Sequence, residues 1–394
     1  ALGYELFTWN NGVHNTVWNV KDDITYYLGN HKITGGLSYE HQMADNAYMR
    51  NGTGYYRYKS LDDFLNGATP EVVCLTYGYN GDLNPVARVQ FNKAGIYAQD
   101  EWNVTENLKL TYGLRLDGMF FDNGDLMTNN AIKELDYNGR HIDTGKWPGN
   151  SLSVSPRLGF VYDVFGDKSL KVRGGTGLFS GRLPLVFFTN MPTNSGMVQY
   201  QAKLNDRVTI VDNKGVNKFP TYTGATVERD GATYLDMSQF AGGLVTDANG
   251  RPTAAALRDK LISMGYPGTI DPTTGTVSGE ISAVDPDFKM PQVWKTSLAI
   301  DYSVPVSFPL TVTAEGIFNK TINAATISDW SVQNPEGFAR LNGADNRPLY
   351  PSGFKTNNSA YVLENTSRGY GWSGSITVNA QPTENISLMA AYTH

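Results

Sequence analysis

The sequence has one cysteine, few charged residues and no long apolar run. Because Cys74 is the only cysteine in 394 residues, the chain can form no internal disulfide bond. Charged residues make up 18% of the chain, the net charge is −6, and lysine and arginine form no cluster. This composition argues against nucleic acid as a partner. No apolar run reaches the ~18 residues that a transmembrane helix needs, so none is predicted.

Motifs for metal binding and catalysis are also missing. The five histidines show no spacing typical of a metal site, and Cys74 offers no second thiolate. No nucleophile motif supports a hydrolase. We therefore predict no catalytic residue, no metal site, no cofactor and no enzymatic activity. The histidines are His14, His31, His41, His141 and His394.

The sequence is rich in aromatic residues and in long alternating segments. Aromatics reach 12%, with 23 tyrosines. Residues 91–121 predict a hairpin with a turn near 105–107, and its second half alternates strictly between apolar and polar side chains. Such alternation predicts a strand with two different faces, about twice the usual length of 5–6 residues. The apolar side carries Leu108, Leu110, Tyr112, Leu114, Leu116 and Phe120; the polar side carries Lys109, Thr111, Gly113, Arg115 and Asp117.

Short and long connections between strands alternate along the chain. Short turns are predicted at 29–31, 105–107, 166–168, 305–309 and 382–385. Long loops are predicted at about 44–90, 122–149, 181–290 and 323–367, with short helices at 60–65 and 254–264. Short turns at one end and long loops at the other are typical of an outer-membrane barrel. We therefore predict an all-β fold, an antiparallel transmembrane β-barrel with extracellular long loops and periplasmic turns. A soluble all-β binding module is the disfavoured alternative.

The number of strands predicts that the barrel is incomplete. We count about eleven strands, including one at residues 1–9, whereas bacterial single-chain barrels have even numbers and no open edge. We interpret 1–394 as part of a barrel domain, with further strands and a plug domain elsewhere in the protein. Many ionisable residues are predicted to face the lumen, which favours a wide barrel of about 22 strands. They are Arg115, Asp117, Arg157, Asp163, Lys171, Arg173, Lys295, Asp301 and Glu315.

Aromatic residues in two of the long loops are candidate substrate contacts. Aromatic side chains suit sugars, peptides and hydrophobic chelates equally well. The alternative, which we favour, is that these residues pack the loops against one another. The candidates are Tyr55, Tyr56, Tyr58, Phe187, Phe188 and Tyr200.

Several segments resemble the barrel of TonB-dependent outer-membrane receptors. The segments are AGIYAQDEWNVTENLKLTYGLRLD (94–117), SVSPRLGFVYDVFGDKSLKVRGGTGLFSGRLP (153–184), MPQVWKTSLAIDYSVP (290–305) and NTSRGYGWSGSITV (365–378). DDITYYLGNHKITGGLSYE (22–40) is similar to the subgroup with an N-terminal carboxypeptidase-regulatory-like domain. These segments include most of the predicted strands, in the order that the family has them.

The resemblance implies a 22-stranded barrel in the bacterial outer membrane, holding a plug. Substrate would bind the outer loops and the plug, and the TonB complex would supply energy for import. The sequence departs from the family pattern because it shows no plug, no TonB box and no terminal aromatic at His394. Implied partners are outer-membrane lipid, the plug, TonB, an unidentified substrate and, as a further candidate, a surface lipoprotein. A second hypothesis is a structural or adhesive surface barrel that docks partner proteins without active transport.

Overall fold

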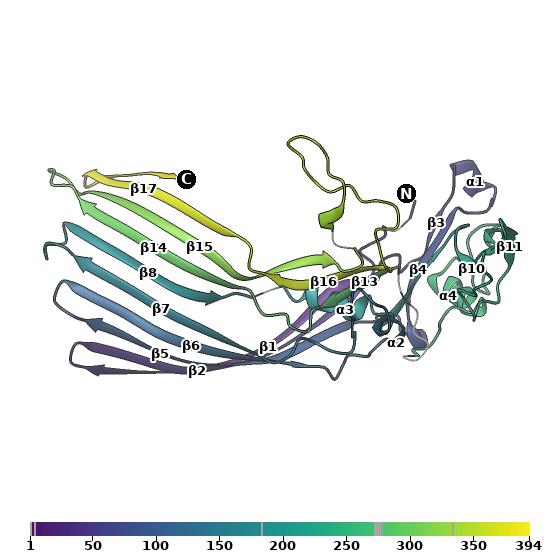
Figure 1. Ribbon diagram of the computed structural model, residues 1–394, viewed down its shortest axis with the longest axis horizontal. Helices are drawn as coiled ribbons and strands as arrows, with labels where there is room; N and C mark the ends of the chain where they lie inside the picture. Colours follow the sequence, from purple (N-terminus) through teal and green to yellow (C-terminus); the bar gives the residue numbers. More distant parts are fainter. Residues whose placement is uncertain (1, 4, 183, 272–276, 278, 333–334) are drawn as a thin grey trace.

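A curved antiparallel sheet forms the body of the molecule in the computed structural model, which describes residues 2–3, 5–182, 184–271, 277, 279–332 and 335–394. Twelve described strands form this sheet, and ten of them follow one another as a meander (Figure 1). The other two lie at the loop end of β15: β16 (Ser359–Thr366) pairs with β15, and β13 (Glu280–Val284) pairs with β16 in parallel. The ten are β1 (Asn11–Leu28), β2 (His31–Tyr48), β5 (Ala87–Asn103), β6 (Leu108–Asp122), β7 (Ser151–Asp163), β8 (Leu170–Ser180), β14 (Gln292–Ser303), β15 (Leu310–Asp329), β17 (Tyr370–Thr383) and β18 (Ile386–Thr393).

All short turns lie at one end of this sheet and all long loops lie at the other (Figure 1). The turns cover residues 29–30, 104–107, 164–169, 304–309 and 384–385. The loops cover 49–86, 123–150, 181–291 and 330–358. Two of these loops are shorter than the sequence predicts. Strand β2 continues through 44–48, β5 already begins at 87, and β15 continues to Asp329, because each extension pairs with a neighbouring strand. These extensions show no apolar alternation, so the sequence does not predict them.

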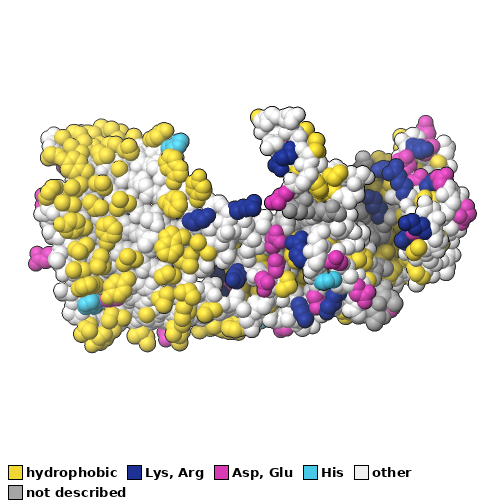
Figure 2. All heavy atoms as spheres, in the orientation of Figure 1, with side chains coloured by type: hydrophobic (Ala, Val, Ile, Leu, Met, Phe, Trp, Pro, Cys, Tyr) yellow, Lys and Arg dark blue, Asp and Glu magenta, His cyan; other side chains and the backbone are white. Residues whose placement is uncertain are grey.

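The strands present two chemically different faces. On most strands one face carries large exposed hydrophobic side chains, and we call it the apolar face. The opposite side of the sheet is called the polar face. Hydrophobic side chains gather over the strands near the short turns, whereas charged side chains gather over the loops (Figure 2). Side chains of the apolar face that are at least 43% exposed include Leu37, Ile96, Leu114, Leu158, Leu298, Ile300 and Ile376.

The first and third long loops fold together into a unit of their own. Strands β3 (Tyr55–Arg57), β4 (Val72–Gly78) and β9 (Gln199–Leu204) form one small sheet, and β10 (Thr209–Val211), β12 (Ala232–Leu235) and β11 (Thr226–Arg229) form another. Helix α4 (Ala254–Ser263) packs on β4 and buries Leu257 and Leu261. Thr253 caps its start, and the predicted terminator Gly265 adopts a φ of 93° just after its end. Helix α1 (Leu61–Leu65) begins at the cap Ser60, so both predicted helices are present.

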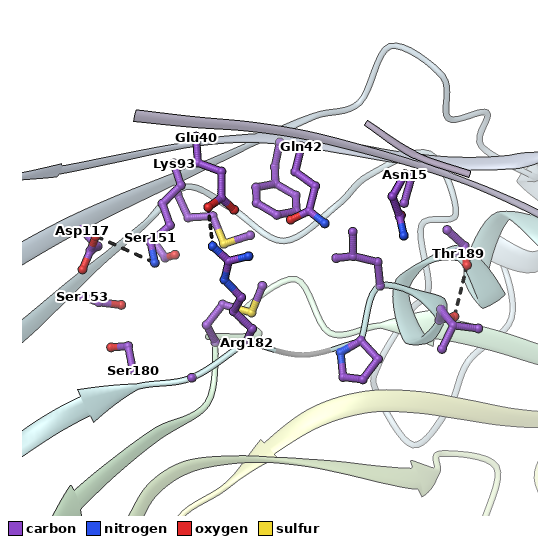
Figure 3. A pocket seen from close by; sticks show the side chains of 18 of the residues that line it. Asn15, Glu40, Gln42, Lys93, Asp117, Ser151, Ser153, Ser180, Arg182 and Thr189 are labelled. Carbon is purple, nitrogen blue, oxygen red and sulfur yellow. Dashed lines mark hydrogen bonds and ion pairs between the residues drawn. The ribbon is translucent and has the colours of Figure 1, made fainter. Parts of the chain in front are cut away.

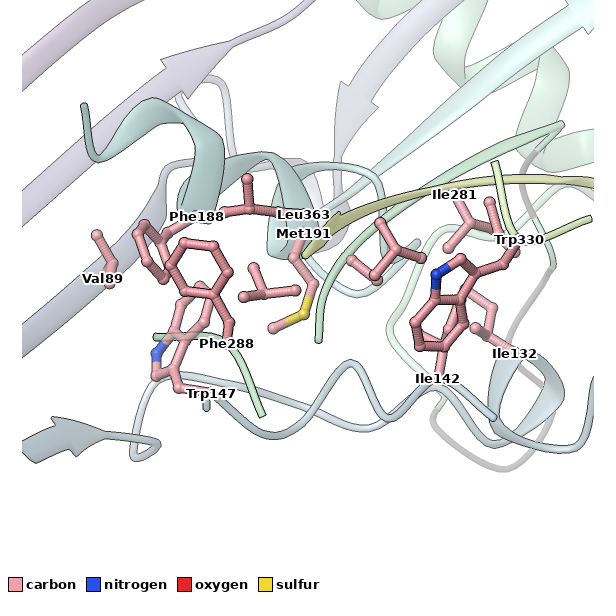
Figure 4. Packing of buried hydrophobic residues seen from close by; sticks show 14 of the residues in the cluster. Val89, Ile132, Ile142, Trp147, Phe188, Met191, Ile281, Phe288, Trp330 and Leu363 are labelled. Carbon is pink, nitrogen blue, oxygen red and sulfur yellow. The ribbon is translucent and has the colours of Figure 1, made fainter. Parts of the chain in front are cut away.

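A second hydrophobic core joins the loops to the top of the sheet (Figure 4). We call it the cap core. It combines residues of α2 (Asn130–Lys133), α3 (Val186–Thr193), β13 and β16 with residues on the polar face of β2 and β5. Its centre is aromatic: Phe188 is 0% exposed and lies 5.4 Å from Phe121, 6.0 Å from Trp147 and 5.7 Å from Phe288, measured between ring centroids. The third loop is therefore anchored inside the curve of the sheet.

The start of the chain differs from the sequence prediction. The described residues among 1–9 form bends and turns, so the strand predicted there is wrong as far as it is described; Ala1 and Tyr4 lie outside the described residues. Without it, the described meander has ten strands instead of about eleven. Among the described residues, no helix is both long enough and apolar enough to cross a membrane.

Cys74 lies in β4 and is expected to resist alkylation in the folded protein. Its side chain is 6% exposed, and burial raises the pKa of the thiol, which lowers the fraction of reactive thiolate at pH 8. We expect N-ethylmaleimide to leave the native protein unmodified over an hour and to add one label after denaturation. Intact mass spectrometry measures both states. Rapid native labelling would show that β4 is exposed.

Candidate functional site: a polar pocket in the sheet wall

Strand register places all nine predicted lumen residues on the polar face. Asp117 lies opposite Ser153, and Arg157 lies opposite Gly177, which in turn lies opposite Lys295. Because side chains alternate along every strand, these pairs fix the face of the remaining members. By the same register, Asp163, Lys171 and Asp301 are neighbours, as are Arg173 and Glu315 across one intervening strand.

Most of these charges neutralise one another. Arg115 donates to Asp117 from Nε at 2.8 Å and from Nη2 at 2.7 Å, a paired contact that only a guanidinium can make. On the same face, two strands further along the sheet, Arg173 donates to Asp301 at 2.9 Å and lies 3.7 Å from Glu315. These pairs hold the polar wall in a defined arrangement.

A cavity of about 380 Å³ lies against this wall, below the cap core (Figure 3). We call it the wall pocket. Strands β1, β2, β5, β6 and β7 form its floor, and the segment from Ser180 through the start of α3 covers it. The lining alternates amides and hydroxyls with apolar side chains. Its polar residues include Asn15, Glu40, Gln42, Asn46, Lys93, Asp117, Ser151, Ser153, Ser180 and Arg182; its apolar residues include Phe91, Met119, Leu185 and Met290.

One ion pair crosses the wall pocket. Arg182, which follows β8, donates to Glu40 on β2, and Figure 3 shows the guanidinium reaching over the pocket to the carboxylate. Glu40 is 7% exposed, whereas the Arg182 side chain is 68% exposed, so the contact brings an exposed guanidinium to a buried carboxylate. Lys93 lies 3.8 Å from Asp117 on the same floor. The pocket therefore offers ionic groups, neutral hydrogen-bonding groups and apolar surface within one concavity, as ligand sites do.

None of the six aromatic candidates lines the wall pocket. Phe188 is at the centre of the cap core and Phe187 packs against it. Tyr56 and Tyr200 pack against the core of the small sheets, where Tyr200 contacts Tyr77 and Tyr266. Tyr58 meets Phe64 edge to face at 5.4 Å. Tyr55 is paired with Cys74 in the β3–β4 sheet. Five of the six therefore make packing contacts, the interpretation favoured from sequence.

Most residues of the wall pocket could not be predicted from the sequence. Glu40, Gln42 and Lys93 lie on strands that the sequence predicts, and counting alternate positions from Lys32 would have placed Glu40 on the polar face. No sequence signal, however, connects Glu40 with Arg182, which is 142 positions away. Their contact depends on how the third loop folds over the wall.

A second cavity of about 450 Å³ lies among the loops, lined by Trp147, Trp330 and Asp143. Asp143 Oδ1 accepts hydrogen bonds from Thr128 Oγ1 at 2.6 Å and from Gly145 N at 3.0 Å, and Oδ2 lies 3.0 Å from Lys133 Nζ. Burial alone would raise the pKa of this carboxyl, but the bonds from Thr128, Lys133 and Gly145 outweigh it, so the pKa is lowered.

The lowered pKa of Asp143 predicts that the loop loses stability in acid. A carboxyl whose folded pKa is depressed stabilises the fold above its unfolded pKa of ~3.9, and the contribution is lost as pH falls through the folded value. We expect protease cleavage of the wild-type protein within 123–150 to increase below about pH 4. In the Asp143→Asn variant, we expect the same segment to be cleaved at pH 7 as readily as it is in the wild-type protein in acid. Pepsin and thermolysin digestion across the range measures this. An Asp143→Asn variant as resistant as wild type at pH 7 would contradict it.

Comparison with known proteins identifies the family. The model of a family described as an outer membrane beta barrel domain matches residues 4–394. The chain belongs to the outer membrane beta-barrel domain family. Among solved structures, the outer membrane transporter YddB from Escherichia coli is 12% identical, with 97% of this chain and 34% of that chain covered and a TM-score of 0.46. The FrpB iron transporter from Neisseria meningitidis (F3-3 variant) is 11% identical, with 98% and 36% covered and a TM-score of 0.41. A comparison with curated proteins found no match.

Membership in the outer membrane beta-barrel domain family confirms the predicted fold class and the location in the bacterial outer membrane. In such a barrel the apolar face contacts lipid and the polar face lines the lumen. The wall pocket therefore opens into the lumen. The chain spans about a third of the length of the two transporters, 34% and 36%. The resemblance to the subgroup with a carboxypeptidase-regulatory-like domain stays a prediction.

Proposed function

We propose that this barrel domain is part of an outer-membrane receptor that binds a solute and imports it with energy from TonB. The wall pocket is the observation that carries the proposal. It is a concave site on the lumen wall that combines an ion pair, amides, hydroxyls and apolar side chains, and it lies directly below the folded loops. A solute arriving from the loop side would meet it before reaching the short-turn end.

The proposal includes a plug domain from the same protein and the TonB complex. The nine charged residues predicted from sequence to face the lumen, from Arg115 to Glu315, would contact the plug there. The loops, which fold around two hydrophobic cores, would face the outside of the cell and offer a surface for a lipoprotein partner. Such a partner is also compatible with the second hypothesis, a surface barrel without active transport.

Solute depletion from the medium tests the proposal. Cells with and without the full-length protein, each with and without TonB, are grown in a complex medium, and the spent medium is compared by mass spectrometry. We expect at least one solute to be depleted only when both proteins are present. Arg182→Ala should weaken depletion, because it removes the ion pair over the wall pocket. Depletion without TonB would contradict energised import, and no depletion by a normally expressed protein would favour the surface-barrel hypothesis.

A further inference from the structure

Positive charges on the polar face are paired with carboxylates almost everywhere in the described part of the sheet. Three cations of this face have no ion pair with any described residue. Lys171 is one of them, but register places it between Asp163 and Asp301. The other two, Arg157 and Lys295, are exposed and have no carboxylate beside them in the register. The paired cations are Lys21 with Asp23, Lys32 and Lys109 with Glu101, Lys93 and Arg115 with Asp117, Arg173 with Asp301, and Arg182 with Glu40.

Arg157 and Lys295 lie in one row across the wall with a glycine between them. Arg157 is opposite Gly177, and Gly177 is opposite Lys295, so their backbones are about 10 Å apart, two strand spacings. Gly177 puts no side chain between them, and a Cβ there would come within 2.9 Å of the Pro156 carbonyl oxygen and 3.1 Å of Arg157 Cγ, so only glycine fits without a shift. No side chain of β8 therefore stands between the two cations in this row.

The neighbouring polar-face residues around these two cations carry no negative charge. The row on the short-turn side consists of Gly159, Gly175, Ser297 and Ile317. The nearest acidic residue on β15 toward the turns is Glu315, four residues from the partner of Lys295 and so about 13 Å along the strand. That carboxylate already contacts Arg173. The charge of the two cations is therefore uncompensated by the described wall.

An aromatic ring holds both head groups. The guanidinium of Arg157 lies 4.6 Å from the ring centroid of Phe179, and the ammonium of Lys295 lies 6.0 Å from the same centroid. Cation–π contacts of this kind orient a charged group without neutralising it. Phe179, on β8 one step closer to the loops, therefore prepares two like charges for a shared anion and reduces the ordering cost of binding it.

We propose that Arg157, Lys295 and Phe179 form an anion-binding site on the lumen wall, taking a carboxylate or phosphate group of a solute over Gly177. The inference rests on the proposed function for the solute's passage, and it narrows the substrate class to solutes with an oxoanion group. Two neighbouring cations without a carboxylate partner among the described residues can bind such a group through charge-assisted hydrogen bonds. An acidic side chain from another segment of the protein would have the same chemistry, and the test separates the two sources.

The probe is inorganic phosphate, titrated into the purified full-length protein in detergent at low ionic strength and followed by isothermal calorimetry. We expect Arg157→Gln/Lys295→Gln to weaken phosphate binding by at least about tenfold. The matched control is Lys21→Gln/Lys109→Gln, which removes two positive charges from the same face; Glu101 keeps its contact with Lys32. The control should stay within about twofold of wild type, because its cations do not contribute to the site.

Each other outcome overturns one statement only. Equal loss in both double variants would show a general charge effect, and no binding by wild type would show that no solute anion is held there. If wild type binds no phosphate and Arg157→Gln/Lys295→Gln also lowers thermal stability more than the control does, an acidic side chain of the protein occupies the site. Phosphate binding that needs both cations, without TonB-dependent depletion, would keep the site and contradict the proposed function. TonB-dependent depletion that is unchanged in Arg157→Gln/Lys295→Gln would support the proposed function and contradict the anion site.

Discussion

Leu114→Arg is expected to prevent stable assembly of the barrel. Leu114 lies midway along β6 on the apolar face and is 46% exposed, so in the outer membrane its side chain contacts lipid. An arginine near the middle of the bilayer costs about 2–4 kcal/mol on the lipid face of a barrel. We expect the variant to lose most of its heat-modifiable, folded band on SDS gels of outer-membrane fractions. Its urea midpoint in lipid vesicles should fall as well.

Thr111→Arg on the same strand is the matched control. Thr111 is three residues away, on the polar face, and opposite Glu101, so an arginine there meets water and a carboxylate. It should assemble at nearly the wild-type level. If both variants assemble equally well, the apolar face does not contact lipid at this height.

Phe188→Ala is expected to release the third loop while the barrel stays folded. The ring is fully buried among Phe121, Trp147 and Phe288, and truncating such a side chain costs about 3–5 kcal/mol. Because these contacts connect the loop with the top of the sheet, their loss should expose segment 181–291 to trypsin on intact cells. The heat-modifiable band should remain.

Phe187→Ala gives the control for this prediction. Phe187 is adjacent but only half-buried at the edge of the cap core. Its truncation should leave trypsin cleavage near the wild-type rate. Equal cleavage of Phe187→Ala and Phe188→Ala would mean that any aromatic loss in α3 loosens the loop, and that the buried ring has no special role.

Much of the barrel wall is predictable from the sequence because its physics is local. On β6, every second residue between Leu108 and Phe120 is apolar or glycine, and that alternation alone fixes which residues face lipid. The same count placed Arg173 and Glu315 on one face, and they lie in contact. Where alternation is missing, as at 44–48 of β2, the prediction ended too early, since pairing with β1 and β5 extends that strand.

The loops and the site depend on contacts that sequence patterns do not contain. An aromatic run such as Phe187 and Phe188 fits a ligand surface as well as a core, and only the burial of Phe188 separates the two. Likewise, Arg182 reaches Glu40 because the third loop bends back over the wall. A pattern of spacing along the chain carries no information about that bend.

The composition of the cap core constrains the order in which the protein folds. Its residues come from β2, β5, α2, α3, β13 and β16, which are separated along the chain by strands of the wall. None of these segments can bury its apolar side chains until the intervening strands have brought the others alongside. We therefore expect the cap core to form late, after the strands of the wall have paired. Until then its hydrophobic residues stay exposed, and the protein is most open to aggregation and proteolysis in that interval.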